Sequence, residues 1–82
     1  DDERLQLIGK FYALFDKLDW EDEKINAAIK NFVAENAVKF PQIAMPLRVI
    51  LTGTDHTPSI ASIMWILGRD ETKLRIQKYI NK

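Results

Sequence analysis

Cysteine is absent from this chain of 82 residues, so disulfide bridges and thiolate metal sites are excluded. Histidine occurs once, as His56, with one carboxylate beside it, which is too few ligands for a metal site. No apolar run approaches the roughly 20 residues that cross a bilayer, and the opening residues lack the basic start of a signal peptide. These absences predict a soluble chain, compatible with a reducing cytoplasm, that holds no metal or redox cofactor of its own.

The sequence also lacks the groups that an independent enzyme needs. Asp55, His56 and Thr57 include the residue types of an acid, a base and a nucleophile, but adjacent loop residues seldom converge on one reacting atom. A phosphate-binding glycine loop and a glycine-rich oxyanion loop are both missing. We therefore expect no catalytic residue in this chain, and we expect His56 to be an exposed loop residue.

Charge is balanced in number and uneven in distribution. Twelve basic residues offset twelve acidic ones, so the chain is not a polycation that coats nucleic acid by charge alone. Residues 1–24 hold four bases and eight acids, a net charge of −4, which leaves +4 for residues 25–82. The last 14 residues are the most basic segment, so we expect a polyanion to prefer the second half of the chain.

The spacing of apolar residues predicts helices throughout. From Arg4 to Leu18 they recur at steps of three and four, which is the spacing of one helical face. A second stripe runs from Ile25 to Val33 and should end near Asn36. The strict alternation of a half-buried strand occurs nowhere. The sequence therefore predicts one all-α domain over residues 1–82, a compact bundle or cage of about five helices.

Proline and glycine predict where the later helices begin and end. Pro41 suits the first turn of a short helix, and Pro46 should kink that helix or begin a separate turn, which predicts a corner. The pair Thr57–Pro58 suits the N-cap and first position of the next helix, which is apolar on nearly every side and should be the central buried helix. Gly68 should end it as a left-handed cap, and Asp70 should cap the last helix.

Arg48 stands alone among apolar residues between Met45 and Gly53. A planar guanidinium can hydrogen-bond or stack on an unpaired base, and the free N–H groups of a helix start at residues 57–60 can meet an RNA backbone or a base edge. An ion pair or a bond to a carbonyl explains Arg48 equally well, and ordinary capping explains the helix start. Chemistry alone leaves both interpretations open.

Three motifs stand at the spacing of a known family. They are PLR-x-x-LTG at residues 46–53, TP at 57–58 and LGRD at 67–70. In this order and without an insertion, they resemble the closing signature of bacterial glutamyl-tRNA synthetases. The likeness is strongest over residues 45–82 and weakest over the first helix. It covers the C-terminal anticodon-binding domain alone, so it implies that the catalytic domain would precede Asp1 in a larger synthetase.

The resemblance also implies site residues. Arg48 is similar to the arginine that contacts an anticodon base, and Thr57, Pro58 and Ile60 match the helix start that lies against the anticodon. Met45 stands where several family members have a glutamine, and methionine can pack or stack but cannot form the same polar contact. The resemblance therefore implies that these five residues bind tRNA.

The function implied is anticodon recognition inside an enzyme. The larger synthetase would attach glutamate to its tRNA with ATP and magnesium, while this chain would bind the anticodon loop without catalysis and without a cofactor. Such an enzyme would work in the cytoplasm as a monomer, with tRNA as its partner and with neither DNA nor a membrane involved.

Two other functions fit a small helical chain. A protein-interaction module would dock a partner on exposed apolar residues such as Trp20, Met45 or Ile60. A helix-turn-helix DNA-binding protein would need an exposed, basic recognition helix, whereas the helix after Pro58 is almost wholly apolar. The DNA-binding interpretation is therefore the weaker of the two.

Overall fold

The structure is a computed structural model that describes residues 2–54 and 59–81. These residues form five α-helices and one 3₁₀ turn, and no strand occurs among them, so the predicted all-α class is confirmed. In chain order the elements are α1 (Asp2–Tyr12), η1 (Phe15–Lys17), α2 (Asp22–Glu35), α3 (Phe40–Thr52), α4 (Ile60–Leu67) and α5 (Arg69–Ile80).

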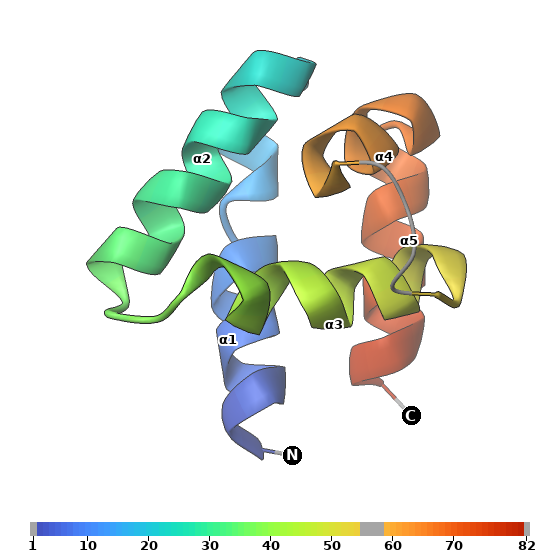
Figure 1. The fold of residues 1–82 in the computed structure, drawn as a ribbon. Helices are drawn as coiled ribbons and strands as arrows, with labels where there is room; N and C mark the ends of the chain where they lie inside the picture. The colour runs from blue at the N-terminus through green and yellow to red at the C-terminus, as the bar shows by residue number, and fades with distance from the viewer. Residues whose placement is uncertain (1, 55–58, 82) are drawn as a thin grey trace.

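Helix α3 crosses the molecule and contacts every other α-helix (Figure 1). Helices α1 and α5 lie behind it and pack on each other, while α4 packs between α2 and α5. The radius of gyration is 11.4 Å, close to the value of about 12 Å expected for a compact domain of this length.

Apolar side chains from all five α-helices and from η1 meet in a single core. An aromatic cluster occupies the part of the core between α1 and α2. The ring of Phe11 lies 5.1 Å from that of Phe15 and 5.2 Å from that of Phe32, centroid to centroid. Trp20 packs edge-on against Phe15, and its indole N–H donates to the carbonyl of Met64 at 2.9 Å. These contacts join η1 and the start of α2 to α4.

Helix α1 ends six residues before the predicted end at Leu18. The amide of Leu14 bonds to the carbonyl of Phe11 at 3.0 Å, three residues back, so the backbone tightens into η1. This turn places Phe15 in the core against Phe11 and Trp20. Packing of the aromatic rings therefore overrides the helical spacing of the sequence.

A separate turn does not begin at Pro46, because α3 continues through it from Phe40 to Thr52. Buried side chains anchor the helix on both sides of the proline, with Ile43 and Ala44 before it and Leu47 and Leu51 after it. A proline inside a helix costs about 3 kcal/mol, and burying a large aliphatic side chain contributes about 1.5–3 kcal/mol. Several such side chains outweigh one proline.

Helix α4 differs from the prediction in position and in burial. It begins at Ile60 with Ser59 as its N-cap, whereas Thr57, Pro58 and His56 lie outside the described residues. The helix is also not wholly buried: Ile60, Ala61, Ile63 and Met64 face the core, whereas Trp65 is 52% and Ile66 75% exposed. With only eight residues packed between two other helices, α4 keeps an outer face.

Gly68 joins α4 directly to α5, which leaves no room for a separate cap. Its amide bonds to the carbonyl of Met64, and its carbonyl accepts from the amide of Thr72, both at 3.0 Å. Its φ of 87° is positive as predicted, but its ψ of 160° is extended rather than left-handed helical. Helix α5 consequently begins at Arg69, so Asp70 lies in the first turn and is not the cap that the sequence predicted.

Candidate nucleic-acid interface

The outward face of α3 carries two of the predicted site residues. Met45 and Val49 are one helical turn apart and are 42% and 53% exposed, so together they form an apolar ridge. Arg48 lies beside this ridge on the flank that also bears buried Ala44 and Leu51. A cation therefore borders an exposed apolar strip, as base recognition by stacking and hydrogen bonding requires.

The side chain of Arg48 retains its hydrogen-bonding capacity. It is half-buried, and its Nε atom is enclosed without a hydrogen-bond partner. Within residues 2–54 and 59–81 it forms neither the ion pair nor the carbonyl contact that would give it a purely structural role. An enclosed, unsatisfied N–H costs free energy, but a covered atom cannot itself donate to a ligand, so an RNA base would have to bind the other nitrogens of this guanidinium.

The C-terminal end of α3 is held from two directions. Gly53 adopts the left-handed conformation (φ 79°, ψ 5°), and its amide bonds to the carbonyl of Val49 at 2.8 Å. The hydroxyl of Thr52 lies 2.7 Å from the carbonyl of Arg48 and accepts from the amide of Thr54 at 3.3 Å. These bonds define the path of the chain as it leaves the helix beside Arg48.

Helix α5 supports the same end of α3 through Arg75. Its Nη1 donates to the carbonyl of Leu51 at 2.5 Å, while its Nε donates to Glu71 at 2.7 Å. The last carbonyls of a helix have no partner inside the helix, so Arg75 satisfies one of them. Glu71 in turn orients the guanidinium, and the exit from α3 is thereby connected to the basic helix.

Of the other predicted site residues, the structure describes Ile60 alone. Ile60 is fully buried at the start of α4, so its side chain supports that helix from the core. Thr57 and Pro58 lie outside the described residues. The structure thus brings Met45 and Arg48 together on α3 and places Ile60 on the helix that packs beside it.

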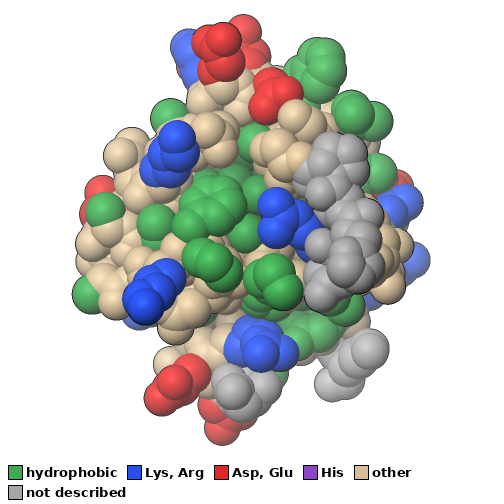
Figure 2. Space-filling model, in the orientation of Figure 1, with side chains coloured by type: hydrophobic (Ala, Val, Ile, Leu, Met, Phe, Trp, Pro, Cys, Tyr) green, Lys and Arg blue, Asp and Glu red, His purple; other side chains and the backbone are tan. Residues whose placement is uncertain are grey.

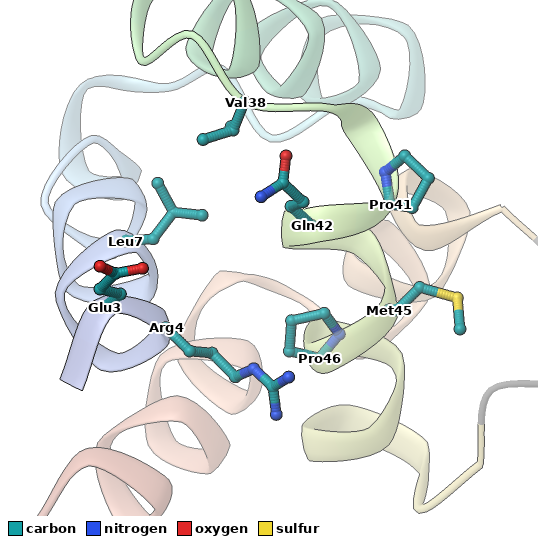
Figure 3. A pocket seen from close by; sticks show the side chains of 8 residues that line it. All are labelled: Glu3, Arg4, Leu7, Val38, Pro41, Gln42, Met45 and Pro46. Carbon is teal, nitrogen blue, oxygen red and sulfur yellow. The ribbon is translucent and has the colours of Figure 1, made fainter. Parts of the chain in front are cut away.

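A recess on the opposite flank of the apolar ridge was not predicted from the sequence. It lies between α1 and α3 and encloses about 280 Å³, with Arg4 and Leu7 facing Gln42 and Pro46 (Figure 3). Because proline has no amide N–H, the carbonyl of Gln42 lacks its usual helical donor beside this recess. The only sequence signal for this flank was the pair Pro46 and Ile50, which are spaced one helical turn apart.

Charge is distributed as the sequence predicted, with acids towards the start of α2 and bases on α5. Lys24 pairs with Asp19 at 3.0 Å, and the hydrogen bond from this pairing raises the pKa of Lys24. Lys73 of α5 reaches Asp16 of η1 at 2.7 Å. That hydrogen bond lowers the pKa of the Asp16 carboxyl and raises the pKa of Lys73.

Figure 2 shows basic side chains around a central apolar area on the face that α3 crosses. Acidic side chains gather mainly at the upper and lower margins of this face. In the described part of the chain, no group of three or more His, Cys, Asp or Glu residues could hold a metal ion. None of the five helices is long and apolar enough to span a membrane.

Comparison with known proteins identifies relatives over nearly the whole chain. Glutamate–tRNA ligase of Methylobacillus flagellatus is 44% identical over 92% of this chain, and that of Paraburkholderia phymatum is 45% identical over 89%. These matches take in 17% and 16% of the relatives, so the chain spans about a sixth of their length.

A solved structure has the same fold. The glutamate tRNA ligase of Elizabethkingia meningosepticum, determined in complex with its amino acid, superposes on the whole chain with a TM-score of 0.93 and 27% identity. The match uses 16% of that protein. The sequence pattern described as the anticodon binding domain matches residues 1–80. The chain therefore belongs to the anticodon binding domain family.

Proposed function

We propose that this chain binds the anticodon loop of a glutamate-type tRNA as one domain of a glutamate–tRNA ligase. The family match over residues 1–80 and the ligase relatives support this proposal. The observation that carries it is Arg48, a half-buried cation that borders the exposed Met45–Val49 ridge and forms no ion pair with any described residue.

The chemistry of aminoacylation would reside elsewhere in the longer protein. The catalytic part would join glutamate to tRNA and would bind ATP and magnesium, while residues 1–82 would form a separate C-terminal domain. In this arrangement the domain orients the tRNA and discriminates its anticodon. We further propose a monomer that works in the cytoplasm, because tRNA is charged where it is used in translation.

Individual residues would divide the work according to their chemistry. The guanidinium of Arg48 would hydrogen-bond one unpaired base, since its planar fork can reach two acceptors at once. Met45 would pack against the face of a base, because a thioether offers no strong polar contact. Thr57 and Pro58 would contact the bound loop, while buried Ile60 would support the start of α4 from the core.

Replacing Arg48 tests this proposal. We expect Arg48→Ala to weaken binding of a glutamate-type anticodon stem-loop by about tenfold or more, because it removes a contact worth roughly 1–3 kcal/mol, and to leave binding of the same hairpin with a scrambled loop unchanged. NMR titration of both hairpins gives the affinities and the residues that shift. Arg48→Lys is the matched control, because it keeps the charge but loses the fork, and it should discriminate as poorly as alanine. Equal affinity of the parent chain for both loops would contradict anticodon reading.

One observation favours a second candidate, a protein-docking surface. Of the three residues predicted for this role, Met45 is exposed, whereas Trp20 is half-buried and Ile60 is fully buried. Trp65 and Ile66 are exposed instead, and Trp65 borders an acidic recess with Glu21 and Glu23. A double substitution, Trp65→Ser with Ile66→Ser, should leave RNA binding unchanged if this face contacts protein and not RNA.

A further inference from the structure

A groove runs along the flank of α3 that faces away from Arg48. Two pockets of about 230 and 360 Å³ adjoin at Val49, Ile50 and Tyr79 and are here together called the α3–α5 groove. Its lining is largely apolar, with Pro46 and Ile50 from α3 and Tyr79 from α5. Met45 and Val49, the ridge beside Arg48, form its near wall.

The rim of the α3–α5 groove is basic. Arg4, Arg75 and Lys78 line the two pockets, and no acidic residue does so. Two acids lie close to these bases. Glu71 of α5 pairs with Arg75 at 2.7 Å, and Glu3 lies with Arg4 in the adjoining recess between α1 and α3 (Figure 3). Lys78 is exposed and forms no ion pair with any described residue. Because Arg75 already pairs with Glu71, attraction of an anion to the rim depends chiefly on Lys78, in a chain that is neutral as a whole.

An apolar lining, an aromatic ring and a rim of cations suit a single strand of nucleic acid. Bases pack on the apolar and aromatic surface in any sequence, because every base has a flat face, while lysine and arginine neutralise the phosphates. An acidic peptide would meet the same charges. RNA is favoured because the groove shares Met45 and Val49 with the Arg48 face, so only the width of one helix, about 10 Å, separates the two.

We propose that the α3–α5 groove binds the tRNA strand as it leaves the anticodon, holding its phosphates and one unstacked base without regard to sequence. This inference rests on the proposed function, since it needs the anticodon beside Arg48. It divides recognition into two parts on either side of the Met45–Val49 ridge. The Arg48 flank selects the loop, and the α3–α5 groove adds affinity to any strand that reaches it.

Salt dependence distinguishes the groove from an ordinary basic surface. Removing one phosphate contact lowers the slope of log K against log salt concentration by about 0.7 for single strands. We expect Lys78→Ala to lower the slope by this amount and to weaken binding at 50 mM salt on the order of fivefold. The loss should be equal for the glutamate-type and the scrambled loop. Lys30→Ala removes another exposed lysine, from α2, and is the matched control.

The outcomes separate this inference from the proposed function. If Lys78→Ala and Lys30→Ala give the same slope and affinity, the groove does not bind RNA and the inference fails, whatever Arg48→Ala does. If Lys78→Ala lowers both affinities equally while the parent chain shows no preference between loops, the groove binds RNA, but anticodon reading fails and with it the placement of the strand beside the anticodon. If a poly-glutamate peptide binds with the same dependence on Lys78 and no RNA does, the groove serves a protein partner and the inference is overturned.

Discussion

Among the described residues, Gly53 and Ala37 adopt the left-handed backbone conformation after a helix, although alanine carries a β-carbon. Gly53 follows α3 with φ 79°, and Ala37 follows α2 with φ 54°. At the second site the amide of Val38 bonds to the carbonyl of Val33 at 3.0 Å, which is the long bond of a Schellman motif. A β-carbon makes this conformation less favourable by about 1 kcal/mol or more, so α2 ends with a conformational cost that α3 avoids.

Ala37→Gly should therefore stabilise the chain, although glycine usually destabilises. Relief of the positive φ outweighs the extra backbone freedom of glycine in the unfolded state, and we expect a gain of about 0.5–1 kcal/mol. A rise in melting temperature of about 3–6 °C would follow for a domain of this size. Thermal unfolding followed by circular dichroism measures it.

Gly53→Ala is the matched control with the opposite sign. A β-carbon at Gly53 would meet no atom within 4 Å, so its effect is purely conformational. We expect a loss of about 1 kcal/mol. If both substitutions lowered the melting temperature, the left-handed assignment at Ala37 would be wrong.

Among the elements, α3 combines the most functions, because it fills the core, bears the apolar ridge and separates the two flanks. It keeps its helical course through Pro46 because buried residues anchor it on both sides. The price is one missing backbone bond, since Pro46 cannot donate to the carbonyl of Gln42. The half-buried proline ring faces the recess that Arg4 lines (Figure 3).

Pro46→Ala should stabilise α3. The new amide restores the bond to the carbonyl of Gln42, and the gain exceeds both the lost packing of the ring and the greater freedom of the unfolded chain, for a net gain of about 1–2 kcal/mol. Urea unfolding gives the free energy, and slower hydrogen exchange at the amides around Gln42 would locate the effect. A lower stability would show that the ring contacts more than compensate for the missing bond.

Helix boundaries show which parts of the fold the sequence can predict. The stripe from Ile25 to Val33 predicts α2, and Pro41 and Gly53 mark the ends of α3, because these signals act within a few residues. The predictions at Leu18, Pro46 and Asp70 are wrong because the three-dimensional packing of side chains and backbone decides each of them. Phe15 turns into the aromatic cluster, buried residues anchor α3 on both sides of Pro46, and the backbone bonds of Gly68 join α4 directly to α5. Apolar spacing and single proline or glycine signals do not specify this packing.

The candidate site divides in the same way. Arg48 could be singled out because a lone cation among apolar residues is visible in one segment, and the structure places it on the flank of an exposed ridge. The α3–α5 groove could not be predicted, because Arg4, Val49 and Tyr79 come from three helices that are far apart in the sequence. Only the packing of α1, α3 and α5 brings them together.

At the scale of the whole molecule, opposite charges connect the acidic first part of the chain to the basic last helix. Lys73 of α5 reaches Asp16 of η1 at 2.7 Å, and the ammonium also lies 5.7 Å from the centre of the Tyr12 ring. The amide of Gln77, one turn further along α5, donates to the hydroxyl of Tyr12. These contacts hold α5 against the turn that ends α1.

The Asp16–Lys73 pair makes stability depend on pH at the acid end. The hydrogen bond from Lys73 lowers the pKa of Asp16 below its ordinary value of 3.8, so the unfolded chain takes up this proton before the folded chain does as the pH falls. The pair therefore contributes its full stabilisation above about pH 4, which is then lost as the pH falls through the folded pKa.

Asp16→Asn should lower the urea midpoint at pH 7, and its difference from the parent chain should shrink towards pH 2.5. Because the carboxylate is exposed, 0.5 M salt should reduce the difference at pH 7. Glu35→Gln is the control, because it removes an exposed acid that forms no ion pair with any described residue. It should not lower the urea midpoint at pH 7. An equal loss in both variants would mean that net charge rather than this pair produces the effect.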